Sequence, residues 1–245
     1  MNKTADYQFT IIIPFYNEEG NVPALEEKLS RYLTHCTKSP ACVLFVNDGS
    51  TDRGGALIKE ACLRHKDFFY IELESNKGIT TAQKAGYDNC FSPIAGYMDA
   101  DLQTDPEDFN LLLEHIDSHD LVIGYRINRQ DSFSRRITSK IANGFRRMMT
   151  SDEAIDTCCP LRVIKTDYAK RLPMFHGMHR FVPALVKMMG GTMCQIPVRH
   201  YPRVAGVAKY NTWNRLIRPF VDCFGFRWMK KRYKSYSLKD NTADE

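Results

Sequence analysis

Asp99 and Asp101 are the residues whose types and spacing most directly suggest chemistry. They follow the short apolar run 94–98 and are separated by a single alanine. Side chains two positions apart in an extended segment point to the same side, so both carboxylates can face one cation. A Mg²⁺-type ion needs few protein carboxylates when substrate phosphates complete its shell, and Gln103 adds a neutral oxygen. The pattern indicates a divalent-metal and phosphate site; a solvated acidic loop that caps a helix at Pro106 is the alternative.

Two common nucleotide-binding motifs are absent from the sequence. No GxGxxG follows the first apolar run, where Pro14 and Asn17 stand instead, and no GxxxxGK[ST] occurs anywhere. We therefore expect a bound anion to be held through a metal ion and side chains rather than by a glycine-rich cradle.

The carboxylate pair belongs to a series of short apolar runs that predict strands. The runs are almost continuously apolar, as expected for strands covered on both faces of a parallel sheet. Helical spacing recurs between them, for example from Val22 to Leu33 and after the Asp105-Pro106 start signal. This alternation predicts an α/β fold, a three-layer sandwich around a mostly parallel central sheet. The runs are residues 9–14, 41–47, 68–74, 94–98 and 121–125.

Polar, turn-forming residues follow every one of these runs. In an open α/β sheet, ligands bind beyond the carboxyl ends of the strands. We therefore expect these segments to converge on one edge of the sheet and to form the site there. They are residues 14–19, 47–52, 75–78, 99–103 and 125–126.

The second half of the chain differs in rhythm and in charge. Residues 1–125 hold 10 Lys/Arg and 20 Asp/Glu, whereas residues 126–245 hold 24 and 9, so a net charge of +5 hides a strong asymmetry. The basic half predicts an anionic partner, with nucleic acid, phosphate and an acidic membrane all open on charge alone. Further along the chain we expect a basic helix at 133–149, a strand within 193–201 and a helix-like segment at 212–234.

Several ordered motifs together resemble one known family. The segments IIIPFYNEE, VNDGSTD, NKGITTAQKAG and MDADLQTDPE are similar to the inverting family 2 glycosyltransferases of the GT-A fold. GYR at 124–126, RRITSKIAN, HRFVPALVKMMGG and VRHYPRVAGVAKYNTWNRL resemble the polyprenyl-phosphate sugar transferases, the dolichol-phosphate mannosyltransferase type. The resemblance covers roughly residues 9–220. It implies one catalytic domain over 1–211, with a donor half at about 9–125 and an acceptor half at about 126–211.

The resemblance implies a nucleotide-sugar site in the first half. The first loop would frame the nucleotide, Asp48 would hydrogen-bond the base, and a second loop would line the nucleotide. Asn47 stands where the family often has an acid, so that position keeps hydrogen bonding without charge. The implied donor-binding residues are Pro14, Tyr16, Asn17, Glu18, Asp48, Asn76, Gly78 and Asp99, and the implied Mg²⁺ or Mn²⁺ ligands are Asp99, Asp101 and Gln103.

The resemblance places the acceptor's phosphate in the second half. Arginine forks suit phosphate oxygens, and Arg135 and Ser139 share one helix face at i and i+4. In RVAGVAKY, Ala208 replaces the family's usual serine and removes a hydroxyl donor. His179 lies in a family-like motif and is a further candidate for shaping this site. The implied acceptor-phosphate residues are Arg126, Arg135, Ser139, Arg203 and Lys209, and those expected to be catalytic are Asp101, Arg126 and Arg203.

The implied reaction is a single in-line displacement at the anomeric carbon by a phosphate oxygen of a polyprenyl phosphate. Such a phosphate is anionic near neutral pH, so it needs orientation more than a general base. A family 2 transferase with a soluble or glycan acceptor and a non-catalytic binding protein are the alternatives. Nucleic acid is not expected as a partner, because no helix-turn-helix, RNP or zinc-finger pattern occurs. The sequence leaves the sugar open, and the nucleotide open between UDP and GDP.

Residues 212–234 combine aromatic and basic side chains at helical spacing, which is typical of an interfacial helix. We expect this segment, with a polar tail to 245, to contact a membrane surface; self-association, a membrane-protein partner and simple core packing are the alternatives. No run of 18 apolar residues and no secretory leader occur, and eight cysteines include no CxxC pair. A cytoplasmic, peripheral protein on the inner face of the membrane is therefore expected. The apolar members are Trp213, Leu216, Ile217, Phe220, Val221, Phe224 and Trp228.

Overall fold

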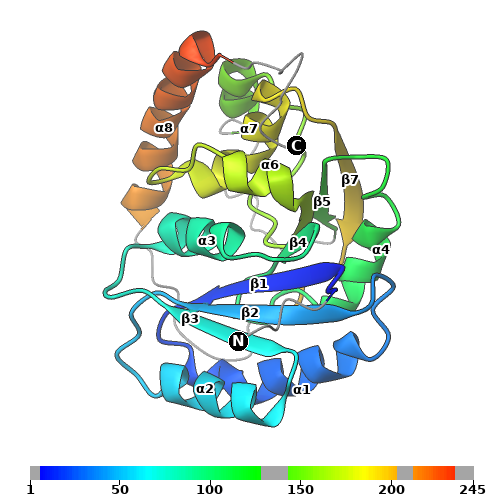
Figure 1. Ribbon diagram of the computed structural model, residues 1–245. Helices are drawn as coiled ribbons and strands as arrows, with labels where there is room; N and C mark the ends of the chain where they lie inside the picture. Colours follow the sequence, from blue (N-terminus) through cyan, green and yellow to red (C-terminus); the bar gives the residue numbers. More distant parts are fainter. Residues whose placement is uncertain (1–5, 128–142, 203–211, 235–245) are drawn as a thin grey trace, which may run out of the picture.

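A single sheet of seven strands organises the molecule (Figure 1). The computed structural model describes residues 6–127, 143–202 and 212–234, the last of these with side chains from 220 onward. The strand order is β3-β2-β1-β4-β6-β5-β7. The strands are β1 (Phe9–Phe15), β2 (Ala41–Asn47), β3 (Phe68–Glu72), β4 (Ile94–Tyr97), β5 (Leu121–Arg126), β6 (Arg162–Lys165) and β7 (Met193–Val198).

The sheet is mostly parallel, with one strand reversed. β1 pairs in parallel with β2 and β4, β2 with β3, and β5 with β7. β6 lies between β4 and β5 and is antiparallel to both. The carboxyl ends of the six co-directional strands therefore share one edge with the first residue of β6.

Helices cover both faces of this sheet. The helices are α1 (Val22–Leu33), α2 (Gly54–Arg64), α3 (Ile79–Asp88), α4 (Phe109–Leu113), α6 (Thr166–Arg171), α7 (Val182–Met188) and α8 (Thr212–Arg232). Short 3₁₀ turns η1 (Glu19–Asn21), η2 (Pro106–Asp108) and η3 (Met178–Phe181) join them, and residues 143–150 are also helical. Figure 1 shows α1 and α2 below the sheet and α3, α6, α7 and α8 on its other side.

Two apolar cores follow from the alternation of side chains along the central strands. In β1, Ile11 and Ile13 face the core shared with α1, α2 and α4, whereas Ile12 faces the core shared with α3, α6, α7 and α8. All seven residues of β1 and of β2 are buried. A strand covered on both faces must be apolar at nearly every position, which explains the continuous runs in the sequence.

The expected α/β sandwich is confirmed, and five of the expected strands lie within about a residue or two of the runs that predicted them. The strand expected within 193–201 ends at Val198, and the basic helix expected at 133–149 is described only from residue 143. β6, a strand of four residues with arginine at its start, was not predicted. Neither were α3, α6 and α7.

Candidate active site

The shared edge of the sheet gathers polar side chains from both halves of the chain. β1, β2 and β4 lead there into loops that begin at Tyr16, Asp48 and Met98. β5 ends there at Arg126, and the reversed strand β6 begins there at Arg162. The expectation that the polar segments converge is therefore confirmed in its geometry.

Asp99 is held by a hydrogen bond from the strand that leads to it. The hydroxyl of Tyr97 donates to Asp99 Oδ1 at 2.7 Å. Burial, and then the nearby charge of Asp101, raise the pKa of Asp99 above its ordinary value, while Arg162 and Arg126 act in the opposite direction. Within the described residues, Asp99 has no Lys or Arg side chain within ion-pair distance. Two neighbouring carboxylates whose charges repel each other are suited to bind a cation between them.

The expected metal ligands also suit a metal ion whose coordination shell is completed by phosphate oxygens. Among the residues that the structure describes, no group of three or more His, Cys, Asp or Glu side chains is arranged to hold a metal. The expected ligands Asp99, Asp101 and Gln103 would offer two carboxylates and an amide, short of a closed protein cage. Mg²⁺ is commonly bound in this way, by one or two carboxylates together with substrate phosphates.

Residues 99–103, which carry the expected ligands and are called the metal loop below, are held by contacts within the loop and with the segment after β7. Leu102 is buried and has a positive φ of 56°, a conformation that costs a residue with a Cβ about 1 kcal/mol. The backbone N–H of Gln103 donates to Asp101 Oδ1 at 3.2 Å. The carbonyl of Gln103 accepts from the backbone N–H of Tyr201 at 2.9 Å and lies 3.1 Å from His200 Nδ1. The segment after β7 thus holds the metal loop in place.

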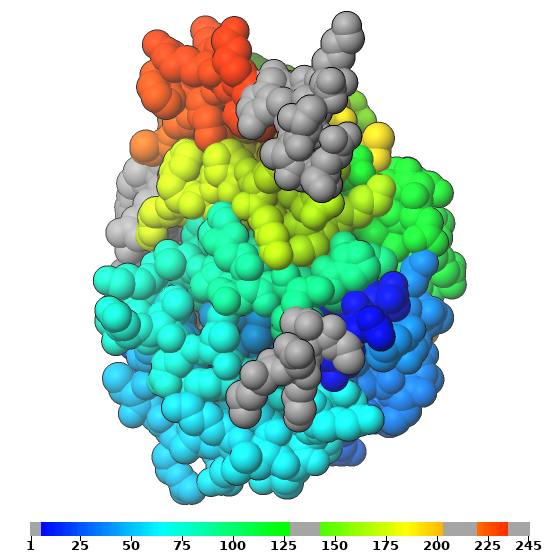
Figure 2. Space-filling model, in the orientation of Figure 1, coloured from blue at the N-terminus to red at the C-terminus, as the bar shows by residue number. Residues whose placement is uncertain are grey.

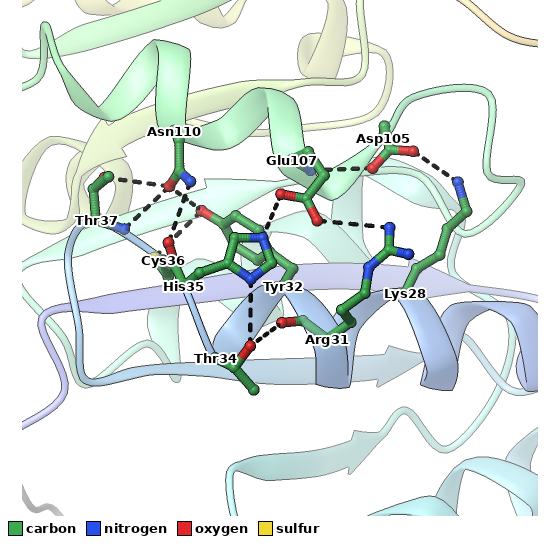
Figure 3. Close-up of polar contacts among 10 residues, drawn as sticks. All are labelled: Lys28, Arg31, Tyr32, Thr34, His35, Cys36, Thr37, Asp105, Glu107 and Asn110. Carbon is green, nitrogen blue, oxygen red and sulfur yellow. Dashed lines mark hydrogen bonds and ion pairs between the residues drawn. The ribbon is translucent and has the colours of Figure 1, made fainter.

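A polar network ties the segment after this loop to α1 (Figure 3). Lys28 Nζ lies 2.7 Å from Asp105 Oδ2, and His35 Nε2 lies 2.5 Å from Glu107 Oε2. The side-chain carbonyl of Asn110 accepts from the buried Tyr32 hydroxyl at 3.1 Å. Asp105 also accepts from the Glu107 N–H, as its expected helix-capping position predicts. The network stabilises the end of the metal loop against the first helix.

Asp48 clamps the loop between β3 and α3. Its Oδ1 accepts from the backbone N–H of Lys77 at 2.8 Å, and its Oδ2 from that of Gly78 at 2.9 Å. The side-chain amide of Asn76 donates to Oδ2 at 3.1 Å. Burial raises the pKa of Asp48, although the two backbone donors act in the opposite direction. Three of the residues expected at the nucleotide, Asp48, Asn76 and Gly78, therefore form one contact.

This clamp also explains the glycine that follows Asp48. Gly49 has a φ of +68°, and a Cβ there would lie 2.6 Å from the backbone nitrogen of Asn76. Only glycine permits both the turn and the close approach of the two loops.

The side-chain amide of Asn47 serves as a hydrogen-bond donor within the fold, which a carboxylate could not do. Its side chain is buried, and its amide donates to Tyr70 Oη at 2.8 Å and to Glu72 Oε1 at 3.0 Å. Its carbonyl accepts from the N–H of Ser50 at 2.9 Å. Because Glu72 is already a carboxylate, the amide suits this position better than a second acid.

The first loop is joined to the loop after β2. Asn17 has a positive φ of 51°, and its side-chain carbonyl accepts from the Thr51 N–H at 2.8 Å. Glu18 accepts from the Asn21 amide at 2.7 Å. Pro14, expected in this loop, lies instead inside β1, where it is buried and paired with Val46. The apolar run continues through Phe15, which moves the start of the loop to Tyr16.

Arg126 is held by an acid that the sequence reading did not name. Its Nε and Nη2 donate to the two carboxylate oxygens of Asp156 at 2.6 and 2.9 Å. This bidentate pair uses two of the five guanidinium donors and fixes the plane of the group. Arg135, Ser139, Arg203 and Lys209, the other expected acceptor residues, lie outside the described residues.

His179 is half-buried and contacts the start of α3. Its Nδ1 lies 2.7 Å from Thr80 Oγ1, at the start of α3. Burial, followed by the charges of Arg180 and Arg162, lowers the pKa of His179 to about 3, so its ring is neutral at physiological pH. The ring therefore packs η3 against α3 and carries no charge for an acceptor phosphate.

Solved structures with the same architecture define the fold class. A mannosyltransferase from Pyrobaculum calidifontis, solved with GDP-Man and Mn²⁺, superposes with a TM-score of 0.63 at 18% identity, covering 96% of this chain and 67% of that one. Glucosyl-3-phosphoglycerate synthase from Mycobacterium tuberculosis, solved with Mn²⁺ and UDP, gives 0.68 at 11% identity, covering 95% and 82%. The fold is therefore the GT-A glycosyltransferase fold.

Sequence comparison then gives the family. Residues 10–172 match the profile described as Glycosyl transferase family 2, and the chain belongs to that family. It is 33% identical over 206 residues to the undecaprenyl-phosphate 4-deoxy-4-formamido-L-arabinose transferase of Pectobacterium atrosepticum, covering 82% of this chain. The chain spans 62% of that relative's length. It is 30% identical over 234 residues to the dodecaprenyl-phosphate galacturonate synthase of Rhizobium johnstonii, covering 93% of this chain and 68% of the relative.

Proposed function

We propose that this chain is a metal-dependent inverting glycosyltransferase that moves a sugar from a UDP- or GDP-linked donor to a polyprenyl phosphate. The observation that carries the proposal is the meeting, at one sheet edge, of the Asp99–Asp101 pair, the Asp48 clamp and Arg126. The names of the relatives from Pectobacterium and Rhizobium support a lipid-phosphate acceptor.

The donor half would bind the nucleotide and its diphosphate. Asp48 holds the loop at Asn76 and Gly78 in place and keeps acceptor capacity for an N–H of the base. Asp99, Asp101 and Gln103 would hold the Mg²⁺ or Mn²⁺ ion, which supplies positive charge next to the leaving diphosphate. The partly buried hydrogen bond from Tyr97 orients one of these carboxylates before substrate arrives.

The acceptor half would orient the lipid phosphate. Arg126 is charged at any physiological pH, because its ion pair with Asp156 raises an already high pKa against the effect of burial. Since Asp156 occupies two donors, three remain for phosphate oxygens in a fixed plane. A phosphate acceptor enters as an anion, so this arrangement needs no carboxylate base.

Transfer assays with substitutions at the carboxylate pair test this function. Asp99→Asn and Asp101→Asn should each lower sugar transfer to polyprenyl phosphate by about 100-fold or more, while the thermal unfolding temperature changes little. Asp117→Asn, at an exposed ion pair with Lys38, is the matched control and should keep full activity. Undiminished transfer by Asp99→Asn would contradict the metal site, and transfer only to soluble acceptors would contradict the lipid substrate.

We also propose that α8 brings the site to the membrane where this acceptor resides. Cys223 and Phe226 face the core, whereas Phe220, Val221, Phe224 and Trp228 are 49–60% exposed. Phe145 of the 143–150 helix stacks on Phe220, with ring centroids 4.2 Å apart, and extends the apolar face. α8 lies at one extremity of the molecule (Figure 2). The exposed basic residues of its last two turns and beyond are Arg227, Lys230, Lys231, Arg232 and Lys234.

Charge and shape favour an anionic bilayer as the occupant of this face. An exposed apolar stripe beside basic residues matches acyl chains and anionic headgroups together, and each basic residue adds about 1 kcal/mol near such a surface. Within the described residues, no helix has the length and apolar character needed to cross a bilayer. Membrane contact would therefore be peripheral for this part of the chain.

Vesicle flotation tests the membrane proposal. The protein should float with phosphatidylglycerol-containing vesicles and less with neutral ones, and Phe224→Glu should abolish flotation. Leu63→Glu, at an exposed site on α2, is the control and should float normally. A stable dimer in solution that ignores vesicles, and that Phe224→Glu dissociates, would show that the face binds a second copy instead.

A further inference from the structure

Arg162 is a buried cation at the edge that carries the metal loop. It is the first residue of β6, and the antiparallel registers pair it with Tyr97 of β4 and Ile123 of β5. Only 5% of the residue is exposed. Because β6 runs antiparallel to β4 and β5, its first residue, Arg162, lies at the sheet edge where the other described strands end.

The guanidinium of Arg162 has few partners for so buried a charge. Its Nη1 donates to the carbonyl of His179 at 3.2 Å, and its buried Nε has no hydrogen-bond partner in the part of the chain that the structure describes. Among the described residues, no carboxylate lies within ion-pair distance of it. A buried charge without a paired carboxylate costs free energy, so the fold alone does not explain an arginine at this position.

The contact that Arg162 makes on its other side leads directly to the metal loop. Its Cζ lies 4.3 Å from the centroid of the Tyr97 ring, a cation–π geometry. The hydroxyl of the same ring donates to Asp99 Oδ1 at 2.7 Å. The guanidinium therefore contacts the face of the ring whose hydroxyl holds the carboxylate.

We propose that Arg162 is a positioning residue that acts through Tyr97 to hold Asp99 in the orientation needed for the divalent cation. The planar guanidinium fixes the tyrosine ring, and the fixed hydroxyl restricts the rotation of the carboxylate. This inference rests on the proposed metal-dependent function and adds Arg162, acting through Tyr97, to the residues that support the Asp99–Asp101 pair.

A role in positioning and a role in stability predict opposite results for the same substitution. Arg162→Met keeps an unbranched side chain of similar reach and removes the buried charge, so the unfolding temperature should stay the same or rise. Orientation of Asp99 would nevertheless be lost. A residue needed only for the fold would show the reverse pattern, with lower stability and unchanged metal binding in the folded fraction.

The test is Mn²⁺ binding followed by electron paramagnetic resonance, with UDP or GDP present, for the wild type, Arg162→Met, Tyr97→Phe and the double variant. Each single substitution should weaken Mn²⁺ binding by about ten- to a hundredfold, which is the size expected for losing one hydrogen bond to a charged group that orients a metal ligand. Nucleotide affinity without metal should not change. Lys165→Met, at the far end of β6 in a partly exposed ion pair with Asp120, is the matched control and should bind Mn²⁺ normally.

The double variant decides whether the effect passes through the tyrosine. Tyr97→Phe keeps the ring but removes the hydroxyl, so adding Arg162→Met should weaken Mn²⁺ binding no further. Additive losses, or wild-type affinity in Tyr97→Phe, would overturn the proposal while leaving the glycosyltransferase function intact. Absence of Mn²⁺ binding by the wild type would instead overturn the metal site, and with it the proposed metal-dependent function.

Discussion

Replacement of Asn47 by aspartate should destabilise the protein in a pH-dependent way. Asn47→Asp exchanges the amide that donates to Glu72 at 3.0 Å for a second carboxylate oxygen. Ser50 keeps its acceptor, and the Tyr70 hydroxyl, which also hydrogen-bonds Glu72, can turn to donate to the new group. The unfavourable change is thus concentrated in the contacts of Glu72.

The size of this repulsion follows from the environment of the two groups. Two like charges 4 Å apart repel by about 1 kcal/mol in water and about 4 kcal/mol at an effective dielectric constant of 20. Asn47 is buried, but the Glu72 side chain is 43% exposed and pairs with Lys59 at 2.9 Å. We therefore expect the free energy of unfolding to fall by about 2–3 kcal/mol at pH 8.

Protonation should remove this penalty at low pH. Glu72 stays ionised because its pairing with Lys59 lowers its pKa. Repulsion between the two carboxylates would therefore raise the pKa of the new acid at position 47. When the pKa of an acid is higher in the folded than in the unfolded state, the free energy of unfolding falls as the pH rises between the two values. The deficit of the variant relative to the wild type should accordingly shrink from pH 8 to pH 4.

Urea unfolding at several pH values measures this deficit. Adding Glu72→Gln to Asn47→Asp restores an amide donor opposite the acid and should recover most of the lost stability. A variant as stable as the wild type at pH 8, or a deficit that does not change with pH, would refute the reasoning.

Two further substitutions test how α8 and the 143–150 helix are held. Gly177→Ala should lower the unfolding free energy by about 2 kcal/mol or more, because φ is +89° there and a Cβ would clash with the Asp222 carboxylate on α8. Calorimetry measures this loss, and unchanged stability would show that the loop adapts to the added methyl group. Asp152→Ala should cost about 3–5 kcal/mol, because it leaves the buried Arg146 without its carboxylate. Chemical unfolding measures that loss, and a change below about 1 kcal/mol would show that water reaches the guanidinium.

Much of the fold could be predicted from local pattern. The strands β1 and β2 are buried on both faces, so nearly every residue in them is apolar and the runs stand out. α1 buries one stripe, at Val22, Leu25, Leu29 and Tyr32, and this periodicity is visible in the sequence. β6 was missed because a strand of four residues, two of them apolar and two basic, gives too little pattern.

The candidate site was only partly predictable, because contacts between distant residues have no local pattern. The expected convergence of the polar segments at one sheet edge agrees with the contact of Asp48 with Asn76 and Gly78, since both loops follow neighbouring parallel strands. The partnership of Arg126 with Asp156 crosses 30 positions and depends on the path of the intervening chain. Pro14 was expected in the first loop, whereas β1 continues through Pro14 to Phe15, because a proline was taken as the end of the strand.

The sequence by itself determined the class of fold, the family and the carboxylate pair, because these depend on periodicity and on short spacings that any strand or turn preserves. Only the tertiary structure decided what surrounds Asp99. The reversal of β6 sets Arg162 against Tyr97 across a strand pair, and it joins residues 65 positions apart that share no motif. Such a pairing is set by the topology of the whole sheet, where burial and register are fixed together.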